Sequence, residues 1–433
     1  MAVIVLRLNI NKEVSKLSNC RAVIKIQFEI EAVMKNIIQK NFWTNTAEPV
    51  AVYPWLAQNE SCEVCIVGGG ITGALCAMYL SKAGINTVLV TSAGIGYGAS
   101  GAICGASEIR PFGGINALSS KIGIQRAVNY CKRCQAAIKE FEELTAAFKD
   151  DCGFYRTDSF IFTDDFEESA ALNKEYLNFL HNGFDVEMIE DDEAGEMFSF
   201  AVEKGYLFKN GGMAADPYRI CQNAIAMAVD AGAGVYEYTE VTTITPQKNS
   251  IELTTSVGKS IRAKNVIFAI GEDNKEFLKD EAERCAGFQA VSDTVHEMPG
   301  WYNKCVITSF GGRESTAYVT PDNKAVMYGM ETSLNPFHAI SEVNAVNSVF
   351  VRRCEVLGER MKSMFPAIEG LDTEHYYAAN TLIGENSLPY IKEKRGYPGC
   401  YFAACGGKNS IIHSQLAAQT MCKNLKKNDS SGL

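Results

Sequence analysis

A glycine-rich turn between an apolar strand and a helix constrains this 433-residue chain more than any other feature. The sequence predicts a buried strand over residues 64–67, followed by the run Gly-Gly-Gly-Ile-Thr-Gly over 68–73. A helix then continues until Gly84, and residues 87–90 have the pattern of a second buried strand. Strand, turn, helix and strand occupy about thirty residues, which is the context that a G-x-G-x-x-G motif requires. The pattern therefore predicts a βαβ unit.

The residues of this turn have separate roles in such a unit. Gly68 permits the tight turn, Gly70 lets a pyrophosphate approach the backbone, and Gly73 lets the helix pack closely on the strand. Ile71 and Thr72 open the helix, whose N-terminus offers N–H groups and a positive dipole end to phosphates. We therefore expect a dinucleotide cofactor; a glycine loop without a ligand is the alternative.

The end of the second strand departs from the usual motif. The acidic residue that binds the adenosine ribose is replaced by Thr91, which Ser92 follows. Threonine can still hydrogen-bond a ribose hydroxyl, but the contact lacks charge assistance and should be weaker. We expect a nucleotide that is held less tightly at this point.

Composition excludes several classes of function. The net charge of −10, with no basic cluster, argues against binding nucleic acid or an anionic membrane. No apolar run approaches the ~20 residues of a membrane-spanning helix. Fifteen cysteines without a framework spacing favour a reducing compartment, and we expect a cytoplasmic protein.

The first 41 residues have the pattern of an N-terminal extension. Residues 2–6 are apolar but too few for a signal peptide. Residues 24–30 alternate between apolar and polar without an evident partner strand. Met34 is a candidate start, and the sequence leaves open whether residues 1–33 are native.

A second glycine-rich segment follows the βαβ unit. Residues 94–105 contain five glycines in twelve residues, including the run Gly98, Ala99, Ser100 and Gly101. Such a backbone suits close contact with a flat or phosphorylated group, and a flexible surface loop is the alternative.

The pattern further along the chain alternates between helices and strands. A helix is predicted over residues 120–149, with Cys131 and Cys134 on its buried stripe, so we predict no metal site there or elsewhere. Asp216 and Pro217 predict the N-cap and first turn of another helix.

Strands are predicted next. A meander is expected over residues 234–263, and an apolar strand over 265–271, ended by Gly271, is typical of the interior of a parallel sheet. Further strands and a helix over 341–365 follow, and Gly406 to Ser410 precede a closing helix.

With these features, the chain resembles the glycine oxidase, sarcosine oxidase and D-amino-acid dehydrogenase (DAO) family of FAD-dependent oxidoreductases. The resemblance covers the chain from Phe42 to about Lys426, and five segments carry it: CIVGGGITGALCAMYL, IGYGASGAICG, NGGMAADPYRI, VIFAIG and LPYIKEKRGYPGCYFAACGGK. The resemblance implies an α/β protein, α+β overall, in which a mostly antiparallel substrate-binding domain is inserted into a Rossmann-type FAD-binding domain. The implied FAD-binding segments are residues 42–155, 206–275 and 376–428, and the substrate-binding segments are 156–205 and 276–375.

The resemblance also implies roles for individual residues. Val241 would place its backbone against adenine, Ser100 and Gly101 would meet the pyrophosphate, and five residues would line the flavin ring: Gly406, Gly407, Lys408, Asn409 and Ser410. Lys408 is the candidate catalytic residue, because a cation near the ring would stabilise negative charge at flavin N1 and O2; a solvated surface lysine is the alternative.

Substrate recognition is less well defined by the sequence. The family often has a carboxylate-binding arginine in the strand aligned with residues 318–321, and none is present here. Arg110 and Arg313 are substitutes by position only, with ordinary surface residues as the alternative. Cys104 and Cys405 leave covalent flavin attachment open.

The resemblance predicts oxidation of a small-molecule amine or amino acid at its C–N bond, with hydride transfer to flavin N5. An NAD(P)-dependent dehydrogenase and a flavin-binding protein without turnover are the alternatives. The sequence does not identify the substrate or the electron acceptor, and it is compatible with both a monomer and a homo-oligomer.

Overall fold

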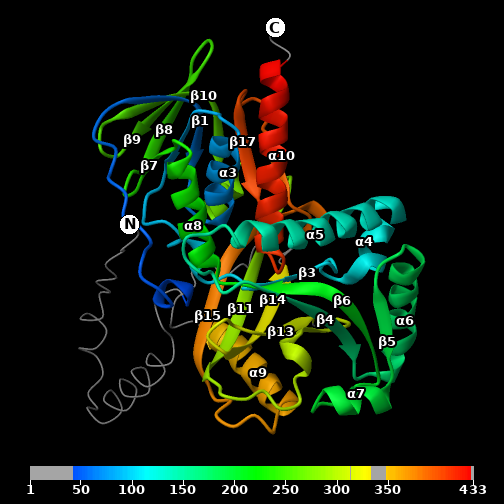
Figure 1. Cartoon of the computed structure of the whole chain (residues 1–433). Helices are drawn as coiled ribbons and strands as arrows, with labels where there is room; N and C mark the ends of the chain where they lie inside the picture. The colour runs from blue at the N-terminus through cyan, green and yellow to red at the C-terminus, as the bar shows by residue number, and fades with distance from the viewer. Residues whose placement is uncertain (1–41, 313, 333–347, 431–433) are drawn as a thin grey trace, which may run out of the picture.

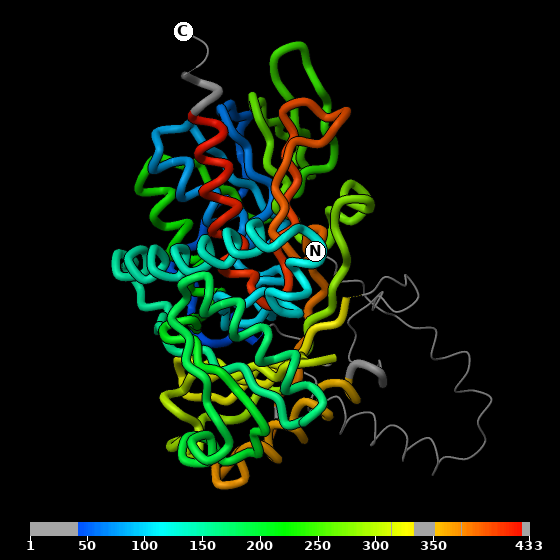
Figure 2. The backbone as a smooth tube through the Cα atoms, turned by 90° about the vertical axis from the view of Figure 1, so that its right-hand side faces the viewer, coloured from blue at the N-terminus to red at the C-terminus, as the bar shows by residue number. Residues whose placement is uncertain are grey.

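The computed structural model describes residues 42–312, 314–332 and 348–430. Figure 1 shows two levels: one sheet with α3, α8 and α10 lies above a second sheet with α9, and α5 crosses between them. Figure 2, turned by 90°, shows the same two levels. The extension over residues 1–41, including Met34, lies outside the described residues.

The first sheet has eight strands and a parallel centre. Its main path runs β16-β17-β10-β1-β2-β7, with β8 and β9 attached beside β10. β1 pairs in parallel with both β10 and β2, while β10 pairs in parallel with β17. Its strands are β1 (Glu60–Val67), β2 (Thr87–Val90), β7 (Gly234–Tyr236), β8 (Val241–Pro246), β9 (Ile251–Thr255), β10 (Ser260–Phe268), β16 (Tyr390–Glu393) and β17 (Cys400–Ala404).

The second sheet has nine strands and is mostly antiparallel. Its path runs β15-β11-β14-β13-β12-β4-β6-β3, and β5 pairs with β6. Only the β12–β4 pair in this path is parallel. Its strands are β3 (Ala106–Glu108), β4 (Tyr155–Thr163), β5 (Val186–Ile189), β6 (Lys204–Ala214), β11 (Ala282–Thr294), β12 (Val306–Ser309), β13 (Ser315–Val319), β14 (Lys324–Thr332) and β15 (Thr373–Gly384).

Eight α-helices are described. They are α3 (Ile71–Lys82), α4 (Gly114–Ile122), α5 (Ile124–Thr145), α6 (Phe166–His181), α7 (Asp191–Met197), α8 (Pro217–Asp230), α9 (Ser348–Met364) and α10 (Ser410–Ser430). Because α3 packs against β1, β2, α8 and α10, it is buried on nearly all sides. Among the described residues, none of these helices combines the length and the apolarity needed to cross a bilayer.

The predicted βαβ unit and mixed fold are confirmed, and the predicted N-cap of α8 is also correct. The Asp216 carboxylate accepts hydrogen bonds from the amides of Tyr218 and Arg219. Two predictions about element limits were wrong. The helix predicted over 120–149 is interrupted at Gly123, where a φ of +86° separates α4 from α5. The end of the meander predicted over 234–263 and the strand predicted over 265–271 form the single strand β10, whose first half pairs with β9 and whose second half lies between β1 and β17.

The limits of the two domains stay a prediction. The second sheet takes β3 and most of β6 and β15 from segments that we predicted to belong to the FAD-binding domain. The chain crosses between the two sheets four times, as often as the five predicted segments imply, but the crossings lie at other positions: before β3, after β6, before β11 and after β15.

Candidate functional site

A cavity of about 980 Å³ lies where the two sheets meet. Its walls come from both sheets and from the segments that join them: residues 67–72, 91–94, 97–103 except 101, 239–244 except 243, 268–273, 277, 378–382 and 403–406, together with Ser410 and Ser414. The glycine turn and the start of α10 thus face one shared space, although they are more than 300 residues apart in the chain.

Close packing explains why the glycine turn tolerates no side chain at two positions. Gly68 has a φ of +113°, and a Cβ there would lie 2.4 Å from the carbonyl oxygen of Ala269. A Cβ on Gly73 would lie 1.9 Å from the carbonyl oxygen of Gly68. Glycine at these positions therefore lets β1, α3 and the end of β10 approach one another.

Gly70 and Ser100 bring the two glycine-rich segments together. Gly70 is the N-cap of α3 and has no side chain to cap the helix, so the start of α3 faces the cavity. The Ile71 amide donates a hydrogen bond to Ser100 Oγ at 2.9 Å. The predicted contact between both segments and one ligand is therefore geometrically possible.

Most of the predicted cofactor-binding residues line this cavity. Besides Gly68, Gly70, Ile71 and Thr72, the cavity wall includes Thr91, Ser92, Gly98, Ala99, Ser100, Val241, Gly271, Gly406 and Ser410. Gly73 and Gly101 do not line it, and Gly407 lines a second, much smaller cavity. Lys408 and Asn409 line neither cavity. The roles assigned to these residues stay predictions.

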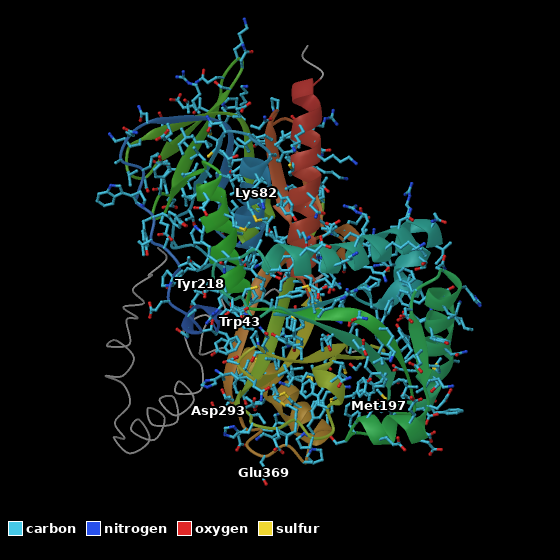
Figure 3. All side chains as sticks on the ribbon, in the orientation of Figure 1. Trp43, Lys82, Met197, Tyr218, Asp293 and Glu369 are labelled. Carbon is cyan, nitrogen blue, oxygen red and sulfur yellow. The ribbon has the colours of Figure 1, made fainter. Side chains whose placement is uncertain are left out.

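Three side chains that the sequence did not single out hold the segment after Ser100. Gln289 Nε2 donates to the carbonyl oxygen of Ala102 at 2.6 Å, and Trp43 Nε1 donates to that of Ile103 at 3.0 Å. The Tyr318 hydroxyl accepts from the Gly105 amide and donates to Gln289 Oε1, both at 3.0 Å. Figure 3 shows Trp43 at the junction between the two levels of the molecule. No local sequence signal links these residues, which lie about 60 to 210 positions from their partners.

The first turn of α10 presents polar groups to the cavity. Ser410 Oγ is buried, lines the cavity and has no hydrogen-bond partner in the described part of the chain. Ser414 Oγ lies 2.8 Å from Thr72 Oγ1, which connects α10 to the start of α3. A ligand oxygen beside the helix N-terminus would accept a hydrogen bond from the Ser410 hydroxyl and would be stabilised by the positive end of the helix dipole.

His413 anchors the same turn from behind. Its Nε2 lies 2.8 Å from the Tyr130 hydroxyl, and its Nδ1 lies 3.2 Å from the carbonyl oxygen of Gly406. Burial lowers the pKa of His413 to about 4, so the ring is neutral at pH 7. A neutral ring that donates from Nδ1 to Gly406 and accepts at Nε2 from Tyr130 satisfies all three groups.

Lys408 and Arg110 are both buried, so the alternative of ordinary surface residues was wrong for each. Their exposed fractions are 3% and 1%. Lys408 Nζ donates to Glu108 Oε1 at 2.5 Å, to Thr308 Oγ1 at 2.9 Å and to Glu314 Oε1 at 3.3 Å. The ammonium group is therefore directed toward the second sheet, and a catalytic role for Lys408 stays a prediction.

Arg110 belongs to the same group of charges. Its Nε donates to Glu175 Oε1 and its Nη1 to Glu314 Oε2, both at 2.6 Å. Burial alone would raise the pKa of Glu314, but Arg110 and Lys408 hold it below its ordinary value. Arg313, the other candidate for binding a substrate carboxylate, lies outside the described residues.

The cysteines give no support for a disulfide. Every cysteine in the described part is a free thiol. Cys405 lines the cavity and Cys104 does not, and burial raises the pKa of each to about 12. Covalent flavin attachment thus stays open. The described residues contain no group of three or more His, Cys, Asp or Glu side chains placed to hold a metal ion.

Comparison with known proteins agrees with this geometry. The model of the FAD dependent oxidoreductase (DAO) family matches residues 63–423. The glycine oxidase of Bacillus licheniformis is 24% identical over 364 residues, which cover 83% of this chain and 91% of that protein. The gamma-glutamylputrescine oxidoreductase of Escherichia coli (strain K12) is 24% identical over 250 residues, 56% of each protein.

A solved structure has the same fold. The crystal structure of glycine oxidase from Geobacillus kaustophilus superposes with a TM-score of 0.69 at 20% identity, covering 85% of this chain and 95% of that one. The family match spans most of the chain and includes both glycine-rich segments and the start of α10, and it does not favour the NAD(P)-dependent alternative. This chain belongs to the DAO family of FAD-dependent oxidoreductases.

Proposed function

We propose that this chain oxidises an amine or an amino acid at a C–N bond, with FAD held in the cavity of about 980 Å³. The observation that carries the proposal is the continuity of this cavity. It joins the glycine turn of α3 to the start of α10 and to residues 378–382 of the second sheet. A dinucleotide and the reacting part of a substrate would therefore share one space between the two sheets.

The residues present fit FAD. Gly70 and Ser100 would receive the pyrophosphate at the N-terminus of α3, where backbone amides and the dipole favour an anion. Thr91 would contact the ribose, and the backbone of Val241 would lie against adenine. The buried, unpartnered hydroxyl of Ser410 would meet a polar atom of the flavin ring.

Bound FAD supplies the hydride acceptor. The contribution of the chain is to position the reacting atoms and to stabilise charge. The N-terminus of α10 directs its positive dipole end toward the cavity, and His413 and Ser414 hold that turn in place.

The second sheet would supply the substrate side. A small second cavity is lined by Gly287, Tyr328, Ala379 and Thr381 of this sheet and by Ala102, Ile103 and Gly407. Gln289 and Tyr318 fix the segment over residues 102–105 from behind, so the wall opposite the substrate would be rigid.

The relatives support this class of reaction. One is named a glycine oxidase and another a gamma-glutamylputrescine oxidoreductase, and both named compounds contain C–N bonds. The free thiols of the described cysteines support a reducing compartment such as the cytoplasm.

Anaerobic mixing tests the proposal. The full chain saturated with FAD is mixed without oxygen with a panel of amines and amino acids, and the flavin absorbance is followed. At least one compound should bleach the flavin, as dithionite does in a parallel sample. If dithionite bleaches the flavin and no amine or amino acid does, the chain binds flavin without this activity and the proposal is refuted.

A further inference from the structure

The charged side chains beside the cavity form one buried ion-pair network. It consists of Glu108 of β3, Arg110, Glu175 of α6, Glu314 and Lys408, whose side chains are between 0% and 5% exposed. Glu314 bridges the two cations, with one oxygen 2.6 Å from Arg110 Nη1 and the other 3.3 Å from Lys408 Nζ. The network connects Lys408, which lies between β17 and α10, to β3, to α6 and to the segment just before β13.

Lys408 has no donor left for a substrate. An ammonium group has three N–H donors, and Lys408 Nζ already has three acceptors, on Glu108, Thr308 and Glu314. Two of those acceptors are carboxylates, which occupy the place that a substrate carboxylate would need. Releasing the lysine would leave Glu108 buried without its cation, which is strongly unfavourable.

The network also carries an excess of acids. Three carboxylates face two cations, so the formal charge is −1. The network lies next to the small cavity, because Lys408 directly follows Gly407, which lines that cavity. Burial raises the pKa of Tyr328, which also lines it, well above its ordinary value, so this region is poorly hydrated. The carboxylate of an amino-acid substrate near Tyr328 would be repelled by the net negative charge of the network, because solvent and salt screen charges poorly in this buried region.

The walls of the larger cavity supply no compensating cation. Among its described lining residues the charged ones are Glu240, Glu272 and Asp273, and none is Lys, Arg or His. Residues 333–347 contain no Lys or Arg, so Arg313 is the one Lys or Arg after residue 41 that the structure does not describe.

We propose that the substrate is an amine without a carboxylate on the reacting carbon, and that the ion-pair network excludes α-amino acids by occupying both nearby cations with the chain's own carboxylates. This inference rests on the proposed function and narrows its substrate class. In the reductive half-reaction the C–H electron pair would leave as a hydride to bound flavin, the amine nitrogen would lose a proton, and an imine would remain. Flavin is the oxidant, so the step balances without a further reagent.

Matched substrate pairs test the proposal in the wild-type chain. Phenethylamine with phenylalanine, and tyramine with tyrosine, differ only in the carboxylate, and each compound has a single amine. In anaerobic titrations of the FAD-saturated chain, the amine of at least one pair should bleach the flavin at a concentration at least ~10-fold lower than the matching amino acid requires. This factor corresponds to the repulsion between the substrate carboxylate and one poorly screened negative charge. Bleaching by an amino acid at an equal or lower concentration overturns the inference and leaves the proposed function intact. If neither member of any pair bleaches the flavin and the wider panel also fails, the proposed function is refuted and this inference with it.

Benzoate provides a readout that needs no turnover, because it has a carboxylate and no amine. Its binding is measured by the change in the flavin absorption bands. Glu314→Gln removes the excess negative charge and frees donors on Lys408 and Arg110, so it should bind benzoate about tenfold more tightly than the wild type. Glu196→Gln, on the exposed face of α7, changes the net charge equally and should leave binding unchanged.

Two results would overturn the inference here. One is equal benzoate binding by Glu314→Gln and the wild type. The other is tight binding by the wild type that Arg313→Gln abolishes, because Arg313 would then supply the carboxylate contact. If Glu314→Gln does not fold, the comparison of matched substrate pairs with the wild-type chain still tests the inference.

Discussion

Buried His413 should make the stability of this protein fall on mild acidification. Burial lowers its pKa from 6.5 to about 4, because the ring is removed from water, and the hydrogen bond with the Gly406 carbonyl offsets only part of this shift. Between pH 6.5 and pH 4 the unfolded chain therefore binds more protons at this position than the folded chain does. Stability from this residue is fully present above pH 6.5 and is lost as the pH falls through 4.

The size of the effect follows from the shift. A difference of about 2.5 pKa units corresponds to about 3 kcal/mol, of which about 2 kcal/mol is lost by pH 5. Asp216 titrates in the same range, since burial raises its pKa to about 6, and it acts in the opposite direction. A comparison with His413→Gln removes this common contribution, because only the histidine differs.

Urea unfolding of the FAD-saturated wild type and His413→Gln at pH 7 and pH 5 measures the difference. The wild type should lose about 2 kcal/mol more than the variant between the two pH values. The variant should be the less stable protein at pH 7, since it loses a hydrogen bond to Tyr130 or Gly406. Equal losses in the two proteins would show that His413 is solvated or already charged, and would refute the neutral ring behind α10.

Other substitutions test separate contacts. Gly68→Ala places a Cβ against the Ala269 carbonyl at a φ of +113°, so the variant should lose FAD binding and its free energy of unfolding should fall by at least ~1–3 kcal/mol. Gly84→Ala is the control, because Gly84 has a φ of +81° but open space around it, and this variant should keep FAD binding in equilibrium dialysis. Thr91→Glu should tighten FAD by ~1 kcal/mol through a charge-assisted contact with the ribose, and unchanged affinity in the same dialysis would place the ribose elsewhere. Lys408→Met leaves Glu108 without its cation and should lower the free energy of unfolding by about 3–5 kcal/mol; Lys408→Met with Glu108→Gln should recover part of this loss, and no recovery would argue against their pairing.

The sequence predicts local structure well where one short pattern decides it. The turn at Gly68 to Gly73 and the cap at Asp216 involve neighbours in the chain, and both were predicted correctly. The long strands β11 and β15 were not located, although together they form an edge of the second sheet. Most of β11 is buried on both faces, so its residues do not alternate between apolar and polar.

In the candidate site, too, the sequence predicts local motifs but not contacts between residues far apart in the chain. Most of the residues predicted from the two glycine motifs and the family resemblance line the cavity, but the wall that β15 contributes, residues 378–382, was not predicted. The ion pairs were not predicted either, because Lys408 lies 300 positions from Glu108 and Arg110 lies 204 positions from Glu314. A lysine next to two glycines suggested a free cation facing a ligand, and only the folded chain shows three acceptors around it.

The most direct test of the central claim is the cofactor that the full chain binds. The chain is stripped of bound nucleotide and titrated separately with FAD, FMN and NAD⁺, and binding is measured by fluorescence quenching and by calorimetry. The cavity and the α3 N-terminus predict one FAD per chain and much weaker binding of FMN, which lacks the pyrophosphate and adenosine. Binding of NAD⁺ without FAD, or FMN as tightly as FAD, would contradict the account.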